Sequence, residues 1–85
     1  MNHFNALINQ QMKTMEKLLY IQAELERCQE IEAELQALQK ETELLSIQKE
    51  ILQMKKELKK IHEVFERQTE EVIESYQNIE EVSIV

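Results

Sequence analysis

Apolar residues in the second half of the chain recur at a spacing that averages about 3.5 positions. With Leu44 taken as position a of a heptad lettered a to g, ten of the twelve a and d positions are apolar. Such a repeat keeps one narrow stripe of a helix facing a partner helix while both supercoil left-handedly. The pattern predicts a coiled-coil helix over residues 44–82, with an oligomer seam of Leu44, Ile47, Ile51, Met54, Leu58, Ile61, Phe65, Gln68, Val72, Ser75, Ile79 and Val82.

The first half of the chain, residues 4–38, carries a wider apolar stripe. Its width is typical of a bundle helix that touches two neighbours, and it predicts more surface to bury than a two-stranded seam requires. Surfaces that contain Met adapt to varied partners, so the start of the stripe is a candidate partner face for another protein. The alternative is burial in the core of the protein's own oligomer. The residues concerned are Phe4, Leu7, Ile8, Met12, Met15, Leu18 and Leu19.

The apolar spacing changes phase at two places. From Cys28 it continues through Ile31 and Leu38, three residues out of step with the preceding repeat. An offset of three residues is a stammer, which overwinds a coiled coil locally. The second change falls across residues 39–43 and divides the chain into two arms of similar length.

Two all-α architectures fit this pattern, both as one coiled-coil domain over residues 1–85. The local residues favour a continuous or gently broken helix of about 125 Å at 1.5 Å per residue. Gln, Lys and Glu around the second break all suit a helix, and the chain has no Pro to stop it and no Gly to end it. The alternative is an αα-hairpin that folds the first stripe onto the second and assembles into a helical bundle.

Either architecture needs a partner, because most helical stability in proteins comes from burying an apolar face. A second copy of the chain is the simplest partner. In a parallel self-pair Glu50 lies against Lys55 of the other copy, whereas an antiparallel seam brings the Glu series together; this favours parallel pairing. Leu at a with Ile at d favours more than two strands, while Gln68 and Ser75 limit the number, so two to four copies stay open.

The charge of the chain is acidic and uneven. The formal net charge is −7, and residues 64–85 contribute −5 of it through six Glu against one Arg. A nucleic-acid binder requires clustered Lys and Arg, so no nucleic-acid partner is expected. No apolar run approaches the roughly 18 residues of a membrane span, and no secretory signal begins the chain. The single cysteine cannot form an intrachain disulfide, so nothing indicates an oxidising compartment. We therefore expect the protein in the cytoplasm, without a membrane partner.

Candidate chemistry is scarce. The only imidazoles are His3 and His62, and Glu66 is the single potential ligand at helical spacing from either of them, which is too few for a zinc site. A chain without glycine cannot form a Gly-rich phosphate loop. Cys28 lies on the apolar stripe and is expected to be a small core residue rather than a redox thiol. We therefore expect no catalytic residue, no metal, no cofactor and no enzymatic activity.

The first third of the chain has a distinctive order of residues, namely Phe4, Leu7, Gln11-Met12-Lys13, Met15-Glu16, Leu18-Leu19 and Glu24-Leu25-Glu26-Arg27-Cys28-Gln29. This stretch resembles the small YgaB-like proteins of bacilli. The resemblance implies a cytoplasmic bacterial protein. It supplies no site residues, because that family has no assigned activity.

The leading hypothesis is a non-enzymatic, homo-oligomeric coiled coil that serves as a structural or adaptor element. The alternative is a small regulatory binder that sequesters a protein partner through the N-terminal apolar face or through the acidic C-terminal end.

Overall fold

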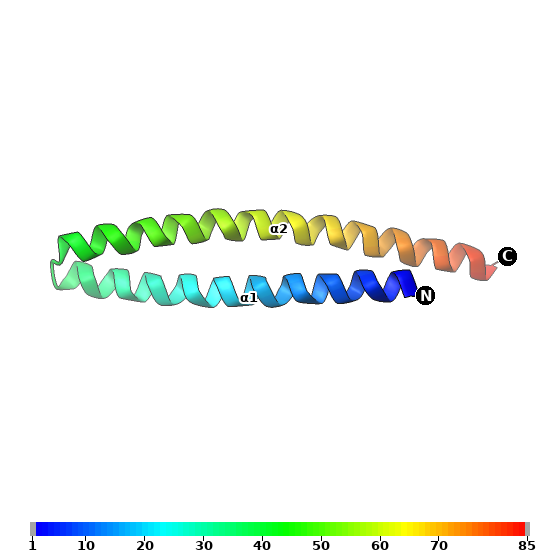
Figure 1. The fold of residues 1–85 in the computed structure, drawn as a ribbon, viewed down its shortest axis with the longest axis horizontal. Helices are drawn as coiled ribbons and strands as arrows, with labels where there is room; N and C mark the ends of the chain where they lie inside the picture. The colour runs from blue at the N-terminus through cyan, green and yellow to red at the C-terminus, as the bar shows by residue number, and fades with distance from the viewer. Residues whose placement is uncertain (1, 85) are drawn as a thin grey trace.

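The computed structural model of the protein describes the backbone of residues 2–84 and the side chains of residues 2–78. Two long helices, α1 (Asn2–Ala37) and α2 (Glu41–Ile84), account for this part of the chain apart from the connecting turn at residues 38–40. The helices run antiparallel, side by side, in a slender hairpin of 68 × 14 × 14 Å (Figure 1). The all-α prediction is confirmed, and the chain adopts the hairpin alternative.

The prediction of a continuous helix, which the local residues favour, is wrong, because the chain reverses direction at Gln39. The backbone of Gln39 takes a φ of 56°, the left-handed conformation that glycine usually supplies at a helix end. The Lys40 N–H donates to the Leu35 carbonyl at 3.1 Å, and the Gln39 N–H donates to the Gln36 carbonyl at 3.2 Å. These two bonds form a Schellman motif, which ends α1 without glycine.

Burial explains why the turn forms against local preference. A left-handed residue with a side chain costs roughly 1–2 kcal/mol. Burying a single Leu or Ile contributes about 1.5–3 kcal/mol, and the hairpin brings both apolar stripes together. α2 then begins immediately, with Glu41 and Glu43 in its first turn, where carboxylates are favourable to the helix dipole.

Replacing Gln39 with glycine should therefore stabilise the hairpin by about 1 kcal/mol, because glycine adopts this φ without steric cost. The matched control is Gln29→Gly, at an exposed position inside α1, which should lose about 1 kcal/mol. Urea unfolding followed by circular dichroism measures both. Destabilisation by Gln39→Gly would contradict the left-handed turn.

The heptad predicted for α2 faces α1 in the structure. Each seam residue from Leu44 to Ser75 is buried or half-buried. The side chains of Ile79 and Val82 lie outside the described residues.

α1 carries one unbroken heptad seam, and the stammer predicted at Cys28 is wrong. Ile31 and Leu38, which define the stammer, are exposed. Polar residues occupy several seam positions of this heptad, so the apolar residues alone do not reveal the repeat. The buried and half-buried residues of this seam are Phe4, Leu7, Gln11, Thr14, Leu18, Ile21, Leu25, Cys28, Glu32 and Leu35.

The best-packed part of the hairpin lies in the half nearer the connecting turn. Leu25 and Cys28 of α1 pack with Ile51 of α2, and the partly buried Ile47, Met54 and Leu58 surround them. No described side chain is completely buried. The core is therefore a single thin layer between two helices.

A polar layer interrupts this seam in the other half of the hairpin. The Gln11 side-chain amide donates to the Thr69 hydroxyl, and that hydroxyl donates to the Phe65 carbonyl at 2.9 Å. Beside them, Gln68 Oε1 is buried and has no hydrogen-bond partner. The antiparallel pairing thus places amide groups from both helices at one level of the seam.

Candidate interaction surface

The hairpin has two long flanks, one on each side of the seam. In an antiparallel helix pair, heptad positions e of both helices share one flank and positions g share the other. Two contacts between the helices lie on the e side, because they involve position e of α2. Gln11 bonds to Thr69, and Phe4 lies against Tyr76 with ring centroids 6.2 Å apart.

The e side, with the b positions beside it, forms what we call the apolar flank. On α1, Met12 is 58% exposed and Leu19 60% exposed, and Met15 is also exposed. The partly buried Ile8 lies below them, and a groove of about 180 Å³ opens there between the helices, reaching Phe65 of α2. The members of the apolar flank are Ile8, Met12, Met15 and Leu19 of α1 and Leu45, Leu52, Ile73 and Tyr76 of α2.

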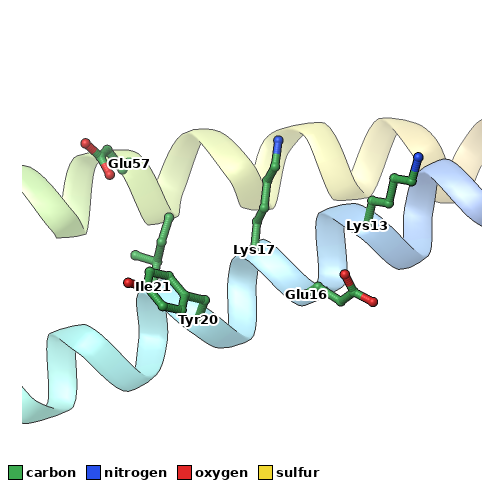
Figure 2. A pocket seen from close by; sticks show the side chains of 6 residues that line it. All are labelled: Lys13, Glu16, Lys17, Tyr20, Ile21 and Glu57. Carbon is green, nitrogen blue, oxygen red and sulfur yellow. The ribbon is translucent and has the colours of Figure 1, made fainter.

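The opposite side, which we call the polar flank, carries a hollow of about 790 Å³ with Lys13, Lys17 and Glu57 among its lining residues. Figure 2 shows Lys13 and Lys17 extending in the same direction from α1, while Glu16 points away from them. The two lysines and two glutamates of its lining balance in charge. Their side chains do not converge on a point where a substrate would react.

Metal-binding arrangements are absent from the described residues. No group of three or more His, Cys or Glu side chains is placed to hold a metal ion there. The one ion pair among these residues joins Arg27 to Glu24 at 2.6 Å on the surface of α1. Cys28 is a free, buried thiol, as expected of a core residue. Neither helix, over its described length, has an apolar stretch that would span a bilayer.

Comparison with known proteins identifies the family. Residues 3–79 match the family model of the YgaB-like proteins, a span that covers most of both helices and the connecting turn. The chain belongs to the YgaB-like protein family. It is 48% identical over 83 residues to the Bacillus subtilis (strain 168) protein described as uncharacterized protein YgaB, covering 98% of this chain and 73% of that protein. No solved structure matches the chain.

The family match confirms the resemblance that the first third of the sequence suggested and extends it over nearly the whole chain. It brings no assigned activity.

The structure divides the predicted N-terminal partner face into two parts. Leu7 and Leu18 are buried against α2, and Phe4 and Ile8 are half-buried. The exposed part consists of Met12, Met15 and Leu19. As a docking surface for another protein, the face stays a prediction.

Residues of α2 that extend this surface were missed by sequence reasoning. Ile73 and Tyr76 are exposed, and they share the e side with Met12 and Met15 only because the helices pair antiparallel. Their b and e heptad positions are the signal that would have found them once a hairpin was assumed. The heptad seam of α2 is occupied by α1 here, and its role between copies stays a prediction.

Proposed function

We propose that this YgaB-like chain is a non-enzymatic helical hairpin that associates with copies of itself and serves as a structural or adaptor element in the cytoplasm. The observation that carries the proposal is the apolar flank, where large side chains remain exposed beside a thin core. Exposed apolar side chains that lie close together, as Met12, Met15 and Leu19 do on α1, indicate a site of interaction.

The small size of the core supports the need for a partner. The buried apolar side chains of the described part are Leu7, Leu18, Leu25, Cys28 and Ile51, whereas twice as many large apolar side chains are exposed. Chains below about 70–80 residues seldom gain more than about 3–5 kcal/mol from a single core, and small natural proteins often associate to compensate. This chain of 85 residues is only slightly longer. Hairpins that pair through their flanks form a four-helix bundle, in which each helix contacts two neighbours.

A second candidate function is the regulatory binder that sequesters a protein partner. The exposure of Met12 and Met15 favours it, because flexible thioether side chains adapt to partners of different shape. Glu66, Glu70 and Glu74 are also exposed near the acidic end, where they would attract a basic partner. The side chains of Glu80 and Glu81 lie outside the described residues.

Sedimentation equilibrium tests the leading proposal. We expect a mass of two to four times the 10.2 kDa of the chain. Small-angle scattering in the same buffer should give a length near the 68 Å of the hairpin, well short of a rod of about 125 Å. A monomer at every concentration would contradict self-association and favour the regulatory binder.

A further inference from the structure

We propose that the hairpin opens in two stages, because its two ends differ in how firmly they hold the helices together. In the first stage the end farther from the connecting turn separates as one unit, while the end nearer the turn stays closed. We call residues 2–14 with 65–78 the open-end half, and residues 18–35 with 44–61 the turn half. This inference concerns the single hairpin and does not depend on self-association.

The seam differs in composition between the two halves. In the turn half, eleven of the twelve seam residues are apolar, and Glu32 is the exception. The cluster of buried side chains formed by Leu25, Cys28 and Ile51 also lies there. Burial of apolar surface is the main force that holds two such helices together, so the open-end half is the weaker one. Four of its eight seam residues are polar, namely Gln11, Thr14, Gln68 and Ser75.

The open-end half is also loosely packed. The buried Gln68 Oε1 has no hydrogen-bond partner, which costs free energy only while the helices are closed. A groove of about 180 Å³ reaches Phe65 on one flank, and a hollow of about 250 Å³ reaches Leu7 and Ser75 from the other. Empty space beside a seam residue removes van der Waals contacts that would stabilise the closed form.

The helical segments of the open-end half are weak on their own. All four Asn residues of the chain lie in it, at positions 2, 5, 9 and 78, and Asn is a poor helix former inside a helix. Glu66, Glu70 and Glu74 follow one another at intervals of four residues, a spacing at which like charges destabilise a helix. Once separated, these short segments should therefore lose their helical structure as well.

The boundary between the halves should be sharp. Opening of the first unit releases the unpaired Gln68 carbonyl, whereas the next step toward the turn must expose Leu18 and its apolar neighbours. Proteins often open locally in such cooperative units. The partly open form exposes Phe4, Leu7 and Phe65 while the turn half still holds the two helices together. The hairpin can thus present seam side chains without unfolding completely.

Native-state hydrogen exchange, resolved to single amides at low protein concentration, tests the two stages. We expect the amides of the turn half to exchange at least about 30-fold more slowly than those of residues 6–14 and 65–78. Residues 2–5 are left out of the comparison because the first amides of a helix have no acceptor within it. The change in rate should fall within one helical turn of Thr14 in α1 and of Phe65 in α2.

The variant Ile51→Ala distinguishes two stages from one. It should speed exchange in the turn half at least about 30-fold. It should leave the open-end half unchanged, because the first stage does not disturb the contacts of Ile51. Ile51→Val repeats the comparison with an expected effect of about two- to tenfold if Ile51→Ala loses helix content by circular dichroism. Leu52→Ala, at an exposed position, is the control and should change neither half by more than about twofold.

Two results would overturn the inference. A smooth gradient of exchange rates from the free ends to the connecting turn, without a step near Thr14 and Phe65, would show ordinary fraying of the helix ends. Equal acceleration of both halves by the Ile51 variants would show that the hairpin opens as one unit. A step in the wild type, together with acceleration of the turn half alone in the variants, would establish the two stages.

Discussion

Replacing Ile51 with alanine should remove about 2–5 kcal/mol from the free energy of unfolding. Ile51 is 6% exposed and packs against Leu25 and Cys28 in the only cluster of buried residues in the described part of the chain. Proteins of this length have about 4–13 kcal/mol in total, so the variant should be largely unfolded at moderate urea concentrations. Urea unfolding followed by circular dichroism measures the loss.

Leu52→Ala is the matched control for this prediction. Leu52 is the next residue along α2 and is 57% exposed, so its truncation should change the stability by about 0.5 kcal/mol or less. The comparison is best made at low protein concentration, where association through the apolar flank contributes little. Equal losses at the two positions would contradict the packing of α2 on α1.

Replacing Gln68 with leucine should instead raise the free energy of unfolding by about 1–3 kcal/mol. The buried Gln68 Oε1 has no hydrogen-bond partner, so an apolar side chain of similar size removes a desolvation cost. Gln53→Leu is the control, because Gln53 is exposed and only weakly bonded to Glu57, at 3.5 Å. A loss of stability in Gln68→Leu would show that this carbonyl has a partner in solution.

The Gln11–Thr69 hydrogen bond should contribute specificity instead. Polar groups in a coiled-coil seam select register and orientation, because a misaligned pairing leaves them buried without partners. Gln11 and Thr69 are joined in one register of the two helices only. We expect Gln11→Leu to lose this selection and to sediment as a mixture of species where the wild type gives one.

The heptad of α2 was predictable from the sequence because apolar residues occupy nearly all of its seam. The seam of α1 was not, because Gln11, Thr14 and Glu32 stand at positions where the pattern calls for apolar residues. A wide stripe and an apparent stammer resulted. The polar residues become recognisable only when the partner helix opposite them is known.

The reversal of the chain was also beyond local reasoning. Gln39 has no intrinsic preference for a left-handed backbone, and its conformation is stabilised by contacts among residues far away in the sequence, such as Leu25 with Ile51. The interaction surface was likewise predictable only in part. Its α1 half, with Met12 and Met15, was read from spacing, and its α2 half required the antiparallel pairing.

The connecting turn at residues 38–40 also has a kinetic consequence. Contacts next to it join residues close in sequence, whereas the contact of Phe4 with Tyr76 closes a long loop. Loop closure is entropically cheaper for short loops, so the helices should zip from the turn outward. The end that carries Met12 and Met15 closes last and should open first. A second copy bound there would slow unfolding at the end farthest from the turn.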